Sequence, residues 1–419
     1  MNLFRSSAVA FVAIVAAGCA GGSAPTSPNA PGTALTALPH QLSAAEQSVI
    51  EASNAFSFAL FDTVSAAQPA TNVFLSPLSA SMSLGMALNG AADTTYDQMR
   101  SALRFGTASQ ADINAGYRSL LNLLTSLDPG VQMNVANSIW YRSDFPFYKT
   151  FLDTATTYFD AEVQPLDFDN ADASMGIING WVSDKTDGKI PSIVDAIKST
   201  DVMFLVNAVY FKAGWRTRFD AALTRDTLFT AADGTQQPVK LMEREGTMDY
   251  AKGATYQAVD LPYSDSAYTM TVVLPAPGTS VDALVASLTP AFWSGLTASL
   301  HPAKVSLSLP KLTLNYNRQL NTDLGALGMP LAFVRDRADF SGMSSLGHSL
   351  YISYVKQNTY LSVDENGTEA AAATVTGVST TAYEPPTVVS VDRPYLFVIR
   401  ERLSGTIVFM GKVASMPGA

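Results

Sequence analysis

Residues with reactive side chains are few in this chain of 419 amino acids. It contains three histidines, His40, His301 and His348, and none of them has a neighbour at metal-ligand spacing. The HExxH, GxSxG and P-loop motifs, which mark metalloproteases, serine hydrolases and nucleotide-binding proteins, do not occur. The sequence therefore predicts no catalytic residue, no metal site and no cofactor. Paired carboxylates stay open as an alternative, because they need only spatial proximity.

Cys19 is the one cysteine, so the chain cannot form an internal disulfide. It follows Arg5 and an apolar stretch over residues 8–17, which is the pattern of a secretory signal and is short for a membrane-spanning helix. The ending AAGC resembles a bacterial lipobox, in which the cysteine thiol is acylated. We expect a lipoprotein signal peptide over residues 1–19, lipidation of Cys19, and secretion to the extracellular or periplasmic face of a bacterial envelope. A plain signal peptide with a chance cysteine is the alternative.

Composition separates the next segment from the rest and excludes some partners. Residues 20–42 are rich in Pro, Gly, Ala and Ser and predict a flexible, solvated tether, with folding starting near Leu42. The whole chain has a net charge of -10, and its 26 Lys and Arg residues are scattered along the sequence. Nucleic acid is therefore not an expected partner.

The stretch DENGTEAAAATVTGVSTTAYEPP, residues 364–386, has almost no large side chains and lies between two strand-like segments. It has no proline from Glu365 to Glu384, so nothing denies it the hydrogen bonds of a β-ladder. In a strand, Glu369 would lie on one face. The opposite face would carry only small residues: Thr368, Ala370, Ala372, Thr374 and Thr376.

Two ordinary interpretations of this stretch are a helix and a linker. Thr, Val and Gly from Thr374 onward argue against continuing a helix. Strand-like sequence resumes directly after the run, which argues against a linker. A segment that must slide between packed strands would need small inward side chains, and this run has them.

The surrounding sequence predicts helices first and strands later. Ser43 and Glu46 have the spacing of a capping box ahead of an amphipathic helix over residues 43–66. Strand-length runs of β-branched, aromatic and apolar residues begin at Met133 and continue to a C-terminal hairpin whose polar turn spans residues 402–405. This order is typical of an α+β fold.

Eight ordered motifs run along most of the chain: NVFLSPLSASMSLGMALNGA (72–91), NGWVSDKTDGKIPSIV (179–194), LVNAVYFKAGWRTRFD (205–220), LPKL (309–312), LGALGM (324–329), ADFSGMS (338–344), DENGTEAAAA (364–373) and DRPYLFVIRERLSGTIVFMGKV (392–413). Together they resemble the motifs of the serpin family of serine protease inhibitors. The resemblance implies one serpin domain over residues 43–417, with about nine helices, three β-sheets and an exposed reactive loop near residues 365–386.

The resemblance also assigns roles within the loop. Its hinge would consist of Glu365, Gly367, Thr368, Glu369, Ala370, Ala371, Ala372 and Ala373. Counting forward from Glu365 places the cleaved bond at Thr381-Ala382, which we favour. Counting back from Pro394 places it at Tyr383-Glu384. Thr before the bond suits an elastase-like protease, and Tyr suits a chymotrypsin-like one. The loop has no Lys or Arg, which a trypsin-like protease would need.

The resemblance further implies a hydrogen-bonded gate beneath the central strands, formed by Ser76, Ser79, Asn207 and Gln357. The last position often carries His in the family. Gln can donate and accept hydrogen bonds but cannot titrate, so a pH-triggered gate is not expected. An alternative role for Ser76, compatible with the first, is a helix cap before Pro77.

These roles imply a monomeric inhibitor, not an enzyme, that traps a serine protease as a covalent acyl-enzyme. A cysteine protease is an alternative target, and the membrane would be reached through the lipid on Cys19. A non-inhibitory serpin-fold binding or adhesion lipoprotein is the second function that we consider.

Overall fold

The computed structural model describes residues 32–198, 200–353, 355–368 and 385–417. The expected signal peptide and Cys19 therefore lie outside the described residues. Nine α-helices and three short 3-10 helices occur in the described part, in agreement with the expected number. They are α1 (Ala44–Ala67), α2 (Pro77–Leu88), α3 (Asp93–Ala102), α4 (Gln110–Ser126), α5 (Lys149–Phe159), α6 (Ala171–Lys185), α7 (Val281–Ser287), α8 (Pro290–Ser299), α9 (Asn321–Ala326), η1 (Ala221–Leu223), η2 (Pro330–Phe333) and η3 (Gly347–Ser349).

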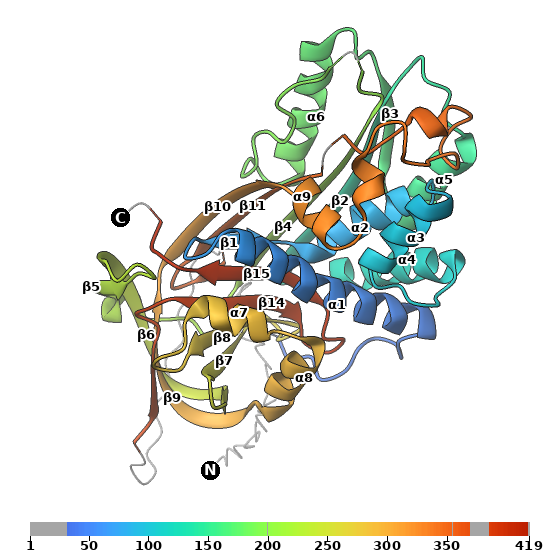
Figure 1. The fold of residues 1–419 in the computed structure, drawn as a ribbon. Coiled ribbons are helices and arrows are strands. Elements are labelled where there is room, and N and C mark those ends of the chain that lie inside the picture. Colours follow the sequence, from blue (N-terminus) through green and yellow to red (C-terminus); the bar gives the residue numbers. More distant parts are fainter. Residues whose placement is uncertain (1–31, 199, 354, 369–384, 418–419) are drawn as a thin grey trace, which may run out of the picture. The chain divides into compact units, whose positions relative to one another are not determined.

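Local sequence explains how the first two helices form. The Ser43 side chain accepts from the Glu46 N–H and the Glu46 carboxylate accepts from the Ser43 N–H, so the predicted capping box is confirmed. Every residue of α2 is buried, as its many small side chains predict for a central helix. Figure 1 shows α1 running beside β15 (Ile407–Val413), with α2 behind it.

The first sheet has six strands, and two residues of the expected hinge form one of them. Its order is β10-β11-β12-β4-β2-β3. The two residues of β12 pair with β11 on one side and with β4 on the other. The strands are β10 (Leu312–Gln319), β11 (Lys356–Val363), β12 (Gly367–Thr368), β4 (Met203–Gly214), β2 (Val131–Arg142) and β3 (Glu162–Leu166).

The second sheet has nine strands and corrects one expectation. Three sheets were expected, but the described strands form two, because β6 is long enough to pair with β7, β9 and β5 and so joins two groups of strands. Its other pairings include the predicted C-terminal hairpin of β14 and β15, which is confirmed. The remaining strands are β1 (Val73–Leu75), β5 (Arg225–Thr230), β6 (Gln236–Lys252), β7 (Tyr256–Pro262), β8 (Tyr268–Pro275), β9 (His301–Pro310), β13 (Thr387–Ser390) and β14 (Tyr395–Glu401).

Two apolar clusters hold these elements together. The larger core joins α1, α2, α4 and the strands of both sheets. A smaller cluster lies beneath α6 and includes Trp140, Ile178, Trp181 and Phe204, so α6 covers β2 and β4. Burial of these side chains is the main force that fixes the sheets relative to the helices.

Residues 32–42 are the described part of the expected tether, and residues 20–31 lie outside the described residues. The Leu35 N–H donates to the Asp265 carbonyl at 2.7 Å, and Arg402 donates to the Leu35 carbonyl. Leu35, Leu38 and Leu42 are partly buried against the core. Backbone hydrogen bonds and spaced leucines therefore hold residues 32–42 on the domain, although their composition predicted a solvated segment.

Candidate functional site

The hinge segment is held at the point where β4 ends. The Trp215 N–H donates to the Asn366 carbonyl at 2.8 Å, and the Trp215 indole N–H donates to the Asp364 carbonyl at 2.9 Å. The Phe219 N–H donates to the Glu365 carbonyl at 3.0 Å. Three successive hinge carbonyls are thus satisfied by the segment that follows β4.

The carboxylate of Glu365 binds the hinge to two further residues, Lys311 and Thr224. It accepts from the Lys311 ammonium group at 2.8 Å and from the Thr224 hydroxyl at 2.7 Å. Burial by itself would raise the pKa of Glu365, but these hydrogen bonds outweigh it and hold the pKa below its ordinary value. Glu365 is therefore ionised at neutral pH and bonded to the strand pair β9 and β10 through Lys311, which lies between them.

Gly367 occupies a position that admits only a glycine. Its φ is +151°, and a Cβ there would lie 2.2 Å from the Ala213 carbonyl oxygen and 2.6 Å from the Gly214 Cα. Such contacts with backbone cannot be relieved by moving a side chain. Absence of a side chain lets the hinge enter between β4 and β11.

Thr368 follows Gly367 in β12, and its side chain points into the domain. It is 1% exposed and pairs with Ala213 of β4 and Val363 of β11. Its hydroxyl shares a 2.8 Å hydrogen bond with the Tyr263 hydroxyl. The Thr368 side chain is therefore buried in the domain and bonded to Tyr263.

We call the boundary between β4 and β11 the slot. In the described part of the chain, the facing edges of these strands pair only with β12, at one end of the slot. Unpaired backbone groups along a strand edge are a template for another strand. In the described residues, β12 is the one strand that occupies this position, and it does so over two residues.

The four predicted gate residues lie on both sides of the slot. Gln357 of β11 accepts from the Ser76 N–H at 3.0 Å and donates to the Ser76 carbonyl at 2.7 Å. Ser79 of α2 donates to Asn207 of β4, which in turn donates to Asn137 of β2. The N-terminal turn of α2 is thus bonded to β11 through one pair and to β4 through the other.

Ser76 takes part in the gate in a way that its sequence did not indicate. It occupies the N-cap position of α2, but its side chain makes no capping hydrogen bond. Its hydroxyl donates instead to the Val408 carbonyl of β15 at 3.0 Å. The cap interpretation is correct for position and wrong for the hydrogen bond, because β15 lies within reach and competes for the hydroxyl.

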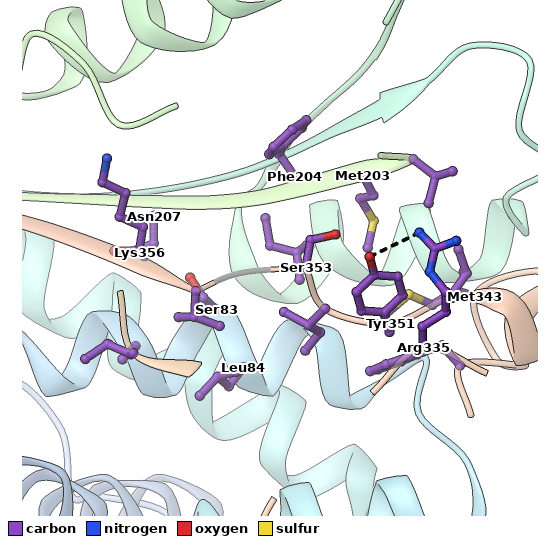
Figure 2. A pocket seen from close by; sticks show the side chains of 18 of the residues that line it. Ser83, Leu84, Met203, Phe204, Asn207, Arg335, Met343, Tyr351, Ser353 and Lys356 are labelled. Atoms are coloured by element: carbon purple, nitrogen blue, oxygen red, sulfur yellow. Dashed lines mark hydrogen bonds between the residues drawn. The ribbon is translucent and has the colours of Figure 1, made fainter. Parts of the chain in front are cut away.

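A cavity of about 240 Å³ lies beside the gate. Figure 2 shows side chains that line it, among them Asn207 and Lys356 from the two strands and Ser83 from α2. Arg335 donates to the Tyr351 hydroxyl at 3.3 Å within its lining. The end of the slot opposite the hinge is therefore partly hollow.

The remaining predicted residues have other outcomes. Glu369, Ala370, Ala371, Ala372, Ala373, Thr381, Ala382, Tyr383 and Glu384 lie outside the described residues. The sequence did not point to Tyr263 or Asn137, whose contacts come from distant parts of the chain. Trp215 was recognised only as part of a motif, and its two bonds to the hinge could not be read from that motif.

The described residues contain neither a metal cluster nor a membrane-spanning helix. No group of three or more His, Cys, Asp or Glu side chains is placed there to hold a metal ion. No helix in the same residues has both the length and the apolar character needed to cross a membrane.

Comparisons with known proteins match this architecture. The family model for "Serpin (serine protease inhibitor)" matches residues 51–416. An uncharacterized serpin-like protein of Thermococcus kodakarensis is 33% identical over 374 residues, covering 88% of this chain and 86% of that protein. The crystal structure of tengpin, a thermophilic serpin in its native state, superposes with a TM-score of 0.80 at 33% identity, covering 92% of this chain and 97% of tengpin. Human thyroxine-binding globulin, complexed with its ligand, superposes with a TM-score of 0.81 at 25% identity, covering 89% of this chain and 100% of that one.

Proposed function

This chain belongs to the serpin family, and from that premise we propose that it is a suicide inhibitor that traps serine proteases covalently. Members of the family are typically protease inhibitors. We further propose that the protease cleaves the loop at about residues 365–386, and that insertion of this loop into the slot makes the covalent complex stable.

The chemistry follows from how a serine protease cuts a peptide. The protease serine oxygen attacks the carbonyl carbon before the cleaved bond, and the bond to the following nitrogen breaks. The amine leaves with a proton, and the carbonyl stays esterified to the protease. Water would normally hydrolyse this ester. Insertion of the freed loop before hydrolysis would carry the attached protease along the slot and distort its active site.

One observation carries the proposal. β12 already lies between β4 and β11, while the rest of their facing edges has no described strand partner. A loop continuing from Thr368 would find a prepared edge on each side. The gain would be the ladder hydrogen bonds that an added strand forms with each edge.

We further propose that the bond between Thr381 and Ala382 is cut, with Tyr383-Glu384 as the alternative. A small residue before the bond suits an elastase-like pocket, whereas Tyr suits a chymotrypsin-like one. Residues 357–392 contain no Lys or Arg, which disfavours a trypsin-like target. A cysteine protease stays an alternative partner, because it also forms an acyl-enzyme.

The test is incubation of residues 20–419 with pancreatic elastase, chymotrypsin and subtilisin, followed by denaturing electrophoresis and mass spectrometry. We expect a band of summed mass that survives boiling, and a released peptide that begins at Ala382. Thr368→Arg is the matched control, because its loop can still be cut while an unpaired charge at this buried position opposes insertion. Cleavage with full protease activity and no such band would contradict the proposal.

A non-inhibitory binding protein is the second candidate. It is favoured by the similarity to thyroxine-binding globulin, which was crystallised with a ligand. Under this alternative, each protease would cut the loop and stay active, and the cut protein would gain no heat stability. The same incubation therefore separates the two functions.

We also propose that the protein is a monomer, secreted and anchored to the bacterial envelope by lipid on Cys19. The support is the lipobox-like ending of the predicted signal peptide. Metabolic labelling with a fatty acid should modify the wild-type chain and leave Cys19→Ser unlabelled. Equal labelling of both would overturn the anchor.

A further inference from the structure

Tyr263 follows β7 and makes two aromatic contacts near the hinge. Its ring stacks on Trp215, with centroids 4.5 Å apart and planes 13° from parallel, and contacts Phe211 edge-on at 5.2 Å. The Tyr263 side chain is fully buried. Packing on two sides fixes where its hydroxyl points.

That hydroxyl is directed at the hinge. It lies 2.8 Å from the Thr368 hydroxyl, and Thr368 is itself 1% exposed. Each of these buried groups needs a hydrogen-bond partner, and each is the partner of the other. Removing one leaves the second unpaired in the core, whereas removing both leaves no unpaired group.

Thr368 differs from the inward positions that follow it in sequence. By strand alternation the next two are Ala370 and Ala372, whose side chains carry no polar atom. Two successive Ala side chains would make no hydrogen bond that favours one depth of insertion over another. The hydroxyl of Thr368 gives the hinge one defined position.

We propose that Tyr263 is a positioning residue that holds the hinge inserted to Thr368 before any protease arrives. Trp215 adds two hydrogen bonds to the hinge backbone and buttresses the Tyr263 ring. The first step of insertion is then complete in the resting protein. After cleavage, the loop continues from a strand already in register and does not have to find the slot.

The consequence for inhibition rests on the proposed trapping function. Without the Tyr263 hydroxyl, the hinge leaves the slot more often, and insertion after cleavage must begin by redocking it. The acyl-enzyme then has more time to hydrolyse. More inhibitor molecules are therefore cut for each protease trapped, while the cleaved bond stays the same.

Tyr268 offers a matched control. It is equally buried, and its ring also contacts Phe211, at 5.6 Å. Its hydroxyl, however, donates to the Leu124 carbonyl of α4. Tyr268→Phe therefore reports the general cost of losing a buried tyrosine hydroxyl in this core, away from the hinge.

The experiment measures amide hydrogen exchange in residues 364–368 of the full-length protein, with no protease present. We expect Tyr263→Phe and Thr368→Val each to speed exchange about tenfold, as the loss of one buried hydrogen bond predicts. The double variant should return close to wild type, Thr368→Ser should retain protection, and Tyr268→Phe should leave the hinge unchanged.

Unchanged exchange in Tyr263→Phe, or a double variant as exposed as either single one, would overturn the inference. The number of inhibitor molecules cut per trapped protease is then measured for the same variants and should rise for both single ones. If the wild type traps no protease, the proposed function fails while the exchange result still decides the role of Tyr263.

Discussion

At the hinge end of the slot, the carbonyls of residues 364–366 and the Thr368 hydroxyl all have partners from the β4 end or from Tyr263. At the gate end, α2 is bonded to β11 through Gln357 and to β4 through Asn207, beside a cavity of about 240 Å³. One end is thus filled and in register, while the other is held by a few side chains around a hollow. If the proposed trapping function holds, insertion would begin at the hinge end, where the contacts are complete, and would proceed toward the gate end.

The largest expected effect comes from a variant that disrupts the hinge end of the slot. Gly367→Ala places a Cβ against the Ala213 carbonyl oxygen and should expel β12, costing about 3 kcal/mol in local stability. Hydrogen exchange at residues 364–368 should rise sharply, and trapping of a sensitive protease should fall at least about tenfold. Gly246→Ala is the control, because nothing lies within 4 Å of a Cβ at that position. Normal trapping by Gly367→Ala would show that the inserted hinge is dispensable.

The second effect weakens the gate. Gln357→Ala leaves the buried Ser76 N–H without its partner and should lower the free energy of unfolding by about 2 kcal/mol. Chemical denaturation measures this loss. Asn358→Ala, on the opposite face of β11, is the matched control and should cost less. An equal loss in both variants would mean that the gate has no special role.

The sequence predicted parts of both ends. The α+β class, the capping box at Ser43 and the inward face of Thr368 follow from local patterns, because periodicity and caps involve neighbours in sequence. The pairing of Thr368 with Tyr263 could not be predicted, since it joins residues 105 positions apart. The docking of residues 32–42 was missed for a related reason, because its hydrogen bonds use the Leu35 backbone and leave no side-chain signature.

The two ends of the slot should also differ in how their contributions to stability depend on pH. The pKa of Glu365 is lowered in the folded state, so its contribution is complete above the unfolded value of about 4.3 and is lost as pH falls through the folded pKa. Glu365→Gln should cost about 1 kcal/mol near neutral pH, since its partner Lys311 is partly exposed. Denaturation curves of the two proteins should converge in acid. A constant difference down to about pH 2 would show that the ion pair is not responsible.

The gate should not share this dependence. Gln357 does not titrate, so the loss in Gln357→Ala should stay constant between about pH 5 and 8, where a histidine would change charge. A Gln357→His variant should introduce a pH dependence in that range. If Gln357→Ala already shows one, another titrating group controls the gate.

The smallest expected effect comes from a variant that partly fills the cavity at the gate end of the slot. Ser83 lines the cavity, and Ser83→Leu should raise the free energy of unfolding by about 0.5 kcal/mol by occupying part of it. The same side chain should slow loop insertion, which is measured as more inhibitor cut for each protease trapped. Ser83→Ala adds no volume and serves as the control. Faster insertion in Ser83→Leu would contradict a gate end that must open.

The central claim is that the loop enters the slot once it is cut. The most direct measurement compares the intact protein with the protein nicked in the loop, by thermal unfolding and by hydrogen exchange along β4 and β11. The account predicts that the nicked protein melts more than about 10 °C higher, as expected for a gain of several kcal/mol. It also predicts slower exchange of amides on the facing edges of both strands. An unchanged melting temperature, with those amides still exchanging at the rate of the intact protein, would contradict it.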